Sequence, residues 1–309
     1  MVLSMECGTV TNMDINLYWV AEGDPERPAV LLINGGGSTL PMWCRELIDP
    51  ILEAGYRVVR FDNRDIGRSS WVPDIRYTIE DMADDASAVL DAVGADAAHL
   101  VGRSMGGLTA QWMALKHRGR VRSLTLIYTT PSMTDDRLPQ STPSARTQTA
   151  AEAVEPATAE DRMKVRMDSN RFYAGTRFPF DEAWSAAEAQ LEVDHAPWNL
   201  PGHFRAVRNT PSLVDRLGEI SAPTLVLHGD ADPIVPVEHG RHLGANIAGA
   251  SYHEFAGLSH ELPPAFCTEI RQLLLDHFQS TELQYWPLIP VSTGSHRRGR
   301  VGAAPSVTP

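Results

Sequence analysis

Ser104 is the residue with the clearest potential for covalent chemistry. It lies at the centre of residues 102–106, GRSMG, which fit the pattern G-x-S-x-G. In this pattern the serine stands on a sharp turn between a strand and a helix, and the glycines remove side chains that would collide with neighbouring backbone. An apolar run precedes the pattern and a stretch of helical character follows it. We therefore expect Ser104 to be a nucleophile that attacks an acyl carbon.

A serine hydroxyl is a weak nucleophile, so it needs a histidine base and an acid that orients the base. His260 and Asp232 are the expected partners, because both stand in loops that directly follow late apolar runs. The chain order serine, aspartate, histidine is the one that many G-x-S-x-G sites use. Asp230 is an alternative acid, although its carboxylate could instead bind backbone N–H groups of its own turn.

The negative charge that develops during acyl transfer needs two backbone N–H donors. Met105 directly follows the nucleophile and is expected to supply one of them. Gly36, in the glycine-rich residues 34–38 (NGGGS), is expected to supply the other, because glycine permits backbone conformations that turn an N–H toward a site. A dinucleotide-binding role for this loop fails, since Leu40 stands where that pattern requires a glycine or alanine.

The elements that must position these residues alternate along the chain. Apolar runs predict buried strands at residues 29–33, 56–61, 98–101, 123–128, 223–228 and 252–255. Helices are predicted between them at residues 40–54, 78–93, 108–117 and 236–243. Thr78 fits an N-cap, with Asp81 as its capping-box partner. The alternation predicts an α/β fold with a mostly parallel sheet flanked by helices, whose ligands bind beyond the carboxyl ends of the strands.

Two segments interrupt the alternation. Residues 131–220 carry no convincing strand, open with a loop-like stretch at 135–156, and continue with helical periodicity. We interpret them as a helical insertion in a core formed by residues 1–130 and 221–280. Residues 281–309 have the composition of a largely disordered tail.

Taken together, these motifs resemble the α/β-hydrolase family over about residues 15–278. The resemblance rests on residues 34–36, 62–69, 102–107, 229–233 and 257–260. Within the family the chain is most similar to small-molecule esterases of the aclacinomycin methylesterase type, through the D-x-R-D-x-G-R-S form of residues 62–69 and PFD at 179–181. The resemblance implies an α/β-hydrolase fold in which residues 131–220 form a helical cap. Two departures stand out: Asn34 and Arg103 replace histidines that are common before the glycine loop and before the serine.

Composition excludes several classes of partner. The 309 residues contain 27 Lys and Arg against 39 Asp and Glu, and the net charge of −12 disfavours nucleic acid and anionic membranes. No apolar run approaches the roughly 18 residues of a membrane span, and the first residues lack a signal-peptide pattern. The three cysteines contain no C-x-x-C pair, so neither a disulfide framework nor a cysteine zinc site is predicted. We expect a cytoplasmic monomer or homodimer with no metal and no organic cofactor.

The expected function is hydrolysis of a small-molecule carboxylic ester through an acyl-enzyme, with a methyl ester or a lactone as suitable substrates. The same triad could instead serve C–C bond hydrolysis, amide hydrolysis or acyl transfer. A non-catalytic, ligand-binding member of the fold is a third hypothesis, which the intact candidate triad disfavours. Asp62 and Arg64 are expected to form a loop-stabilising salt bridge rather than to bind substrate.

Overall fold

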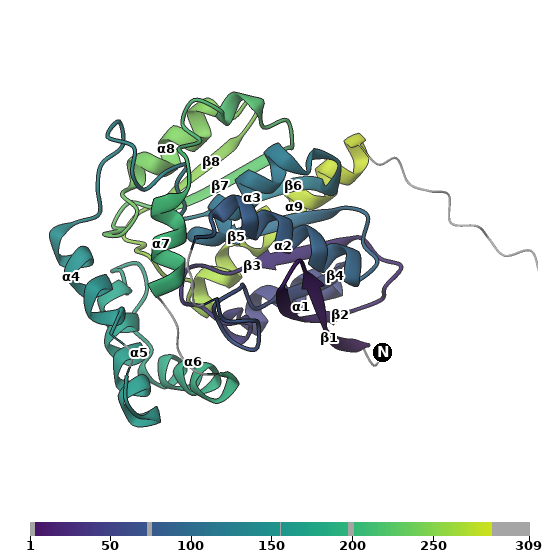
Figure 1. Cartoon of the computed structure of the whole chain (residues 1–309). Coiled ribbons are helices and arrows are strands. Elements are labelled where there is room, and N and C mark those ends of the chain that lie inside the picture. The colour runs from purple at the N-terminus through teal and green to yellow at the C-terminus, as the bar shows by residue number, and fades with distance from the viewer. Residues whose placement is uncertain (1–3, 73–75, 155, 197–200, 286–309) are drawn as a thin grey trace, which may run out of the picture.

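One sheet of eight strands runs through the centre of the molecule, in the order β1-β2-β4-β3-β5-β6-β7-β8 (Figure 1). The computed structural model describes residues 4–72, 76–154, 156–196 and 201–285. The strands are β1 (Met5–Asn12), β2 (Ile15–Glu22), β3 (Ala29–Ile33), β4 (Arg57–Phe61), β5 (Ala98–Arg103), β6 (Val121–Ile127), β7 (Thr224–Gly229) and β8 (Ser251–Phe255). β1 and β2 pair antiparallel, as do β2 and β4, and the remaining pairs are parallel.

Helices cover both faces of the sheet. They are α1 (Arg45–Glu53), α2 (Ile79–Ala92), α3 (Met105–Lys116), α4 (Pro143–Glu152), α5 (Ala159–Tyr173), α6 (Glu182–His195), α7 (Pro201–Asn209), α8 (Val237–Asn246) and α9 (Pro264–Tyr285). Residues of α2, α3 and α8 share one apolar core with one face of the sheet, whereas α1 and α9 contribute to a second core. Because both faces are covered, every residue of β3, β4 and β5 is buried. The mostly parallel α/β architecture predicted from the alternation is confirmed.

The start of α2 tests a prediction that rests on neighbouring residues alone. The Thr78 hydroxyl accepts a hydrogen bond from the Asp81 N–H, and the Asp81 carboxylate accepts one from the Thr78 N–H. The predicted capping box at the start of α2 is therefore confirmed. β1 and β2 were not predicted, because β1 is an edge strand with no buried residue and lacks the continuous apolar run of the central strands.

Helices α4 to α7 lie between β6 and β7, where the sequence predicted a helical insertion, and α4 to α6 gather at one side of the molecule (Figure 1). The loop expected at 135–156 is wrong in part, because α4 occupies ten of its residues. Thr142 caps that helix by accepting a hydrogen bond from the Ala145 N–H, and Pro143 occupies its first position. Threonine followed by proline is a helix-start signal that the Ser, Thr and Pro content obscured.

The carboxyl-terminal helix is longer than the sequence predicted. α9 runs to Tyr285, so the first residues of the expected disordered tail are helical. Thr281 is buried, and Glu282 forms an ion pair with Arg122 and a hydrogen bond with the His99 ring, which fastens this part of the helix to the sheet. The rest of the expected tail, residues 286–309, lies outside the described residues.

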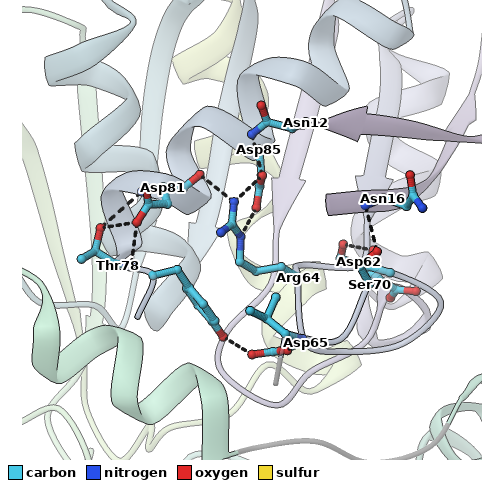
Figure 2. A network of polar contacts seen from close by, with 12 residues as sticks. Asn12, Asn16, Asp62, Arg64, Asp65, Ser70, Thr78, Asp81 and Asp85 are labelled. Atoms are coloured by element: carbon cyan, nitrogen blue, oxygen red, sulfur yellow. Dashed lines mark hydrogen bonds and ion pairs between the residues drawn. The ribbon is translucent and has the colours of Figure 1, made fainter. Parts of the chain in front are cut away.

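The loop at residues 62–69, which carries the D-x-R-D-x-G-R-S motif, is held by buried polar contacts (Figure 2). Arg64 makes two hydrogen bonds, of 2.6 and 2.7 Å, with the Asp85 carboxylate of α2. Asp65 accepts a hydrogen bond from the Tyr77 hydroxyl at 2.7 Å. The expected pairing of Asp62 with Arg64 is therefore wrong, since Asp62 binds other groups: the N–H groups of Leu40 and Arg68, and the His195 ring.

Two further sequence expectations concern membranes and thiols. Across the described ranges, no helix combines the length and apolar character needed to cross a bilayer. Cys7, Cys44 and Cys267 are free cysteines, and Cys7 is exposed. The Sγ atoms of Cys44 and Cys267 lie 2.8 Å apart, although 223 residues separate them in sequence. A contact of such long range leaves no spacing signal in the chain.

Candidate active site

Ser104 lies on a strained turn between β5 and α3. Its backbone has φ 52° and ψ −122°, a conformation that residues with a side chain rarely adopt. A Cβ atom at Gly106 would lie 2.0 Å from the Ile33 carbonyl oxygen, and one at Gly102 would lie 2.4 Å from the Gly106 carbonyl oxygen. The glycines are therefore required for the turn to pack against the sheet, as the G-x-S-x-G pattern predicted.

His260 connects the serine to an acid. It lies in the loop after β8, and its Nε2 is 3.0 Å from the Ser104 Oγ, while its Nδ1 is 2.7 Å from the Asp232 Oδ2. With Nδ1–H donating to the carboxylate, Nε2 is free to accept the serine proton. The side-chain rings of Tyr128 and Tyr173 flank the imidazole, with centroids 4.6 and 6.2 Å from its own. The three predicted site residues thus form one continuous chain of hydrogen bonds.

The two candidate acids have different partners. Asp232 follows β7, and its second oxygen accepts hydrogen bonds of 2.9 Å from the backbone N–H groups of Ile234 and Val235. These bonds fix the carboxylate in the orientation that meets His260. Asp230 instead accepts a hydrogen bond of 2.7 Å from the Gly257 N–H, which joins its loop to the loop that carries His260. Geometry therefore favours Asp232 as the orienting acid and gives Asp230 a role in the loop.

Gly36 and Met105, the predicted oxyanion donors, line the same cavity as Ser104. At Gly35 a Cβ atom would lie 3.2 Å from the Ser104 Cβ, so the glycine loop runs directly beside the serine. Within the described part of the chain, neither the Gly36 N–H nor the Met105 N–H donates to a protein acceptor. The next N–H along, that of Gly37, is already donated to the His203 ring. The Gly37 N–H is therefore occupied, and Gly36 remains the donor that we predict for this loop.

A cavity of about 870 Å³ opens on Ser104 and His260. Core loops and the inserted helices α4 to α7, called the cap from here on, both line it. The cap supplies most of the large side chains. Its aromatic lining consists of Tyr128, Tyr173, Phe178, Phe180, Trp184 and Phe204. All of these aromatic residues except Tyr128 belong to the insertion between β6 and β7. The size is at the upper end of ordinary ligand pockets, roughly 300–1,000 Å³.

The two departures from the family pattern contact each other. The Arg103 Nε donates to the Asn34 Oδ1 at 3.0 Å, and the Asn34 amide donates to the Thr39 carbonyl at 2.7 Å. The Arg103 guanidinium also lies over the Trp43 ring, 5.0 Å from its centroid. Arg103 is buried and lines the cavity. Asn34 and Arg103 therefore form one linked pair that braces the glycine loop.

Sequence reasoning missed two polar residues of the cap. Glu188 of α6 lines the cavity, and its burial raises the pKa of the carboxyl to about 7 in spite of the opposing charges of Arg103 and Arg166. His203 of α7 is fully buried against the glycine loop, and burial lowers the pKa of its ring. The Pro-Gly-His sequence at 201–203 is the signal that could have revealed the helix start, because proline favours the first helical position.

No cluster of three or more His, Cys, Asp or Glu side chains in the described ranges could hold a metal ion. His239, which the sequence placed on one helix face with His242, instead contacts the Thr130 hydroxyl at 2.7 Å and donates to the Pro139 carbonyl at 2.8 Å. Both histidines lie on α8, as the sequence predicted. The ring nitrogens of His239 are thereby occupied by protein partners.

Comparison with known proteins agrees with the geometry. Residues 28–263 match the family model of the alpha/beta hydrolase fold. The rhodomycin D methylesterase DnrP of Streptomyces peucetius is 31% identical over 279 residues, covering 83% of this chain and 92% of that protein. The putative carbamate hydrolase RutD of Variovorax paradoxus is 33% identical over 249 residues, covering 77% of this chain and 86% of that protein.

Solved structures share the same fold. The esterase EaEST of Exiguobacterium antarcticum superposes with a TM-score of 0.74 at 22% identity, covering 89% of this chain and all of that one. The enol-lactonase of Burkholderia xenovorans LB400 superposes with a TM-score of 0.71 at 22% identity, covering 88% of this chain and 100% of that one. The matched length and the identity of the relatives are sufficient to assign the family, as the motifs predicted. The chain belongs to the α/β-hydrolase family.

Proposed function

We propose that the protein is a serine hydrolase that cleaves a small-molecule carboxylic ester through an acyl-enzyme. The observation that carries the proposal is the hydrogen-bonded chain from Ser104 through His260 to Asp232, which opens on a cavity large enough for a bulky substrate. The names of the relatives, which include methylesterases and enol-lactonases, support hydrolysis of an ester or lactone.

In the proposed reaction, the Ser104 Oγ attacks the ester carbon while His260 Nε2 takes the hydroxyl proton. Asp232 holds the imidazole and stabilises its positive charge. The N–H groups of Gly36 and Met105 bind the oxyanion of the tetrahedral intermediate. Its collapse breaks the C–O bond, and His260 protonates the departing alcohol. Water, deprotonated by His260, then attacks the acyl-enzyme and releases the acid and the free serine.

The cavity supports a bulky, partly aromatic substrate. Its aromatic lining offers flat apolar faces, and a planar ring system would bury large area against them. Two relatives that are 31% identical are named rhodomycin D methylesterases, which favours a methyl ester over other esters. Relatives of 28–30% identity are named as hydrolases of 2-hydroxy-6-oxo dienoates and related compounds. Hydrolysis of a C–C bond by the same triad is therefore the second candidate function.

We also propose the division into a core and a cap, with residues 131–220 as the part that selects the substrate. Free cysteines, one of them exposed, support a reducing compartment such as the cytoplasm. A monomer or homodimer without nucleic-acid partners is consistent with the net charge of −12.

A substrate panel tests the proposal. Aryl methyl esters, polycyclic methyl esters, short-chain 4-nitrophenyl esters, lactones and a dienoic C–C substrate are each incubated with wild type and with Ser104→Ala. We expect turnover of at least one ester class, best for ring-bearing methyl esters, and none by the variant. Turnover of the C–C substrate alone would overturn the ester assignment in favour of the second candidate.

A further inference from the structure

We propose that His203, a residue of the cap, positions the oxyanion donor of the core. The inference rests on the proposed function, since it concerns the geometry of the same site. Among the described residues, no hydrogen bond joins His203 to Ser104 or His260, so His203 would act through the backbone of the glycine loop. The proposal makes the cap part of the catalytic arrangement as well as a wall of the cavity.

The contacts of His203 determine which backbone atoms it holds. The Gly37 N–H donates to the His203 Nδ1 at 3.0 Å, and the His203 Nε2–H donates to the Arg64 carbonyl at 2.7 Å. Both bonds require the neutral ring with its proton on Nε2. The side chain is fully buried, and its Cβ would lie 3.7 Å from a Cβ at Gly36. One ring therefore connects the glycine loop to the loop at residues 62–69.

A second cap residue holds the same glycine from its other side. The Arg166 Nη2 of α5 donates to the Gly37 carbonyl at 3.1 Å and also pairs with Glu192 of α6. Gly37 has φ +70°, a conformation that other residues rarely adopt. The Gly37 N–H belongs to the rigid peptide that follows Gly36, so its bond to His203 fixes that plane. The Gly36 N–H belongs to the peptide before Gly36, whose Gly35 carbonyl accepts a hydrogen bond from the Ser38 N–H at 3.3 Å. With the planes on both sides of Gly36 held, the direction of its N–H is restricted.

α7 reaches the glycine loop only because its second residue is a glycine. A Cβ at Gly202 would lie 2.3 Å from the Asp65 Oδ2 and 2.9 Å from the Tyr77 hydroxyl. Asp65 and Tyr77 belong to the buried network of the 62–69 loop (Figure 2). In this network Arg64 binds Asp85 of α2, and Asp65 accepts the hydrogen bond from Tyr77. At the other end of α7, the Thr210 hydroxyl accepts a hydrogen bond from the Ile79 N–H at 2.8 Å. The loop with the D-x-R-D-x-G-R-S motif therefore provides the surface on which the start of α7 packs. Its Arg64 carbonyl also fixes the orientation of the His203 ring.

Three substitutions of His203 separate positioning from simple packing. His203→Asn keeps an acceptor near the position of Nδ1, whereas His203→Gln places its amide near Nε2 and His203→Ala removes both groups. Loss of one oxyanion donor costs about 10²- to 10³-fold in kcat, so its misdirection should cost about 10- to 100-fold. We expect this loss for His203→Ala and His203→Gln, with KM changed by less than about threefold. His203→Asn should recover most of the lost kcat.

The measurement uses 4-nitrophenyl butyrate as substrate and 3-octylthio-1,1,1-trifluoropropan-2-one as a ligand whose serine adduct carries an oxyanion. The affinity for this ketone should fall in parallel with kcat. His239→Ala is the matched control, because His239 is also a buried histidine with two hydrogen bonds but contacts the Thr130 hydroxyl and the Pro139 carbonyl. It should lower the melting temperature without lowering kcat per folded site.

The outcomes are distinguishable. A kcat for His203→Ala and His203→Gln within about threefold of wild type, or equal losses for all three variants, would overturn the positioning role. A loss that appears in KM alone, with ketone affinity unchanged, would also overturn it. If wild type neither hydrolyses the ester nor reacts with a fluorophosphonate, the proposed function fails and this inference fails with it.

Discussion

The core and the cap bury different kinds of side chain. α3, behind the serine, buries every residue except Lys116 and packs against the sheet through apolar groups. In α5 of the cap only Ser169 is buried, and the buried residues of α4 and α6 are small or polar. Apolar burial contributes roughly 25 cal/mol per Å², so the core supplies most of its own stability and these cap helices supply little.

Where the cap meets the core, α7 buries Ala206 in the apolar core, and directed polar contacts join the cap to the loops that carry the site residues. The Gly257 carbonyl, in the loop of His260, accepts hydrogen bonds from the N–H groups of Thr176 and Arg177. Glu261, next to His260, accepts one from the Gly175 N–H at 2.6 Å. In the same way, His203 and Arg166 bind the glycine loop through the N–H and the carbonyl of Gly37. The core thus supplies the candidate reacting groups, and the cap is joined to the glycine loop and to the loop of His260. It also meets the loop of Asp232, where the Thr142 N–H donates to the Pro233 carbonyl at 2.9 Å.

The largest effect expected lies in the core. His260→Ala removes the base, and by comparison with other serine hydrolases kcat should fall by about 10⁴- to 10⁶-fold. Trp184→Ala in the cap removes one wall of the cavity and should act mainly on KM. Steady-state kinetics on the same ester measure both variants. If Trp184→Ala lowered kcat as strongly as His260→Ala, the assignment of catalysis to the core and of substrate binding to the cap would be wrong.

Asp232→Asn should have the next largest effect. The amide cannot hold the imidazole in the required tautomer, so we expect kcat to fall by about 10²- to 10⁴-fold. Asp230→Asn is the matched variant, and it should cost less than about tenfold because Asp230 binds only the neighbouring loop. Kinetics at pH 8 on both proteins make the test. A larger loss for Asp230→Asn would reverse the assignment of the acid.

Acid should weaken the core at α9. Burial lowers the pKa of His277 from 6.5 to about 4, while its Nε2–H donates to the Leu124 carbonyl. The unfolded chain then binds the proton more strongly, so this stability is fully present above pH 6.5 and is lost as the pH falls toward 4. The difference corresponds to about 3 kcal/mol. Urea unfolding of wild type and His277→Gln at pH 7.5 and 4.5 should show a smaller loss in the variant. Equal losses would contradict the buried, neutral state of His277.

The smallest of these effects concerns the joint between core and cap. Gly202→Ala places a Cβ against the Asp65 carboxylate and should cost about 1–3 kcal/mol in unfolding free energy, with a fall in kcat as α7 shifts. Gly218→Ala is the control, because a Cβ there meets no atom within 4 Å. Urea titration and ester kinetics should show a loss of stability and of kcat for Gly202→Ala only. Equal values for both variants would mean that the position of α7 does not depend on the close contact between Gly202 and Asp65.

The core and its site could be predicted because their determinants are local. Ser104, Asp232 and His260 each stand just after a strand, and parallel strands bring their carboxyl ends to one edge of the sheet. The fold follows from the same alternation. The departures at Asn34 and Arg103 were visible as residues, but their mutual hydrogen bond was not, since 69 residues separate them.

The cap could be predicted only as helical. α4 has little apolar periodicity and buries only Ala145 and Glu152, so periodicity does not reveal it. α7 does bury Ala206 in the core, but an apolar pattern does not show which loops the helix packs against. The partners of His203 are the Gly37 N–H and the Arg64 carbonyl, 166 and 139 residues away, and backbone groups of this kind carry no sequence signature. The same holds for Asp62, whose partners are two backbone N–H groups and a cap histidine rather than the arginine two residues on.

Covalent labelling with a fluorophosphonate tests the central claim most directly. Intact-mass spectrometry of the wild type should show one adduct per chain, and peptide mapping should place it on Ser104. Ser104→Ala should remain unlabelled under the same conditions. An adduct on Ser104→Ala, or one mapped to another residue of the wild type, would show that Ser104 is not the nucleophile.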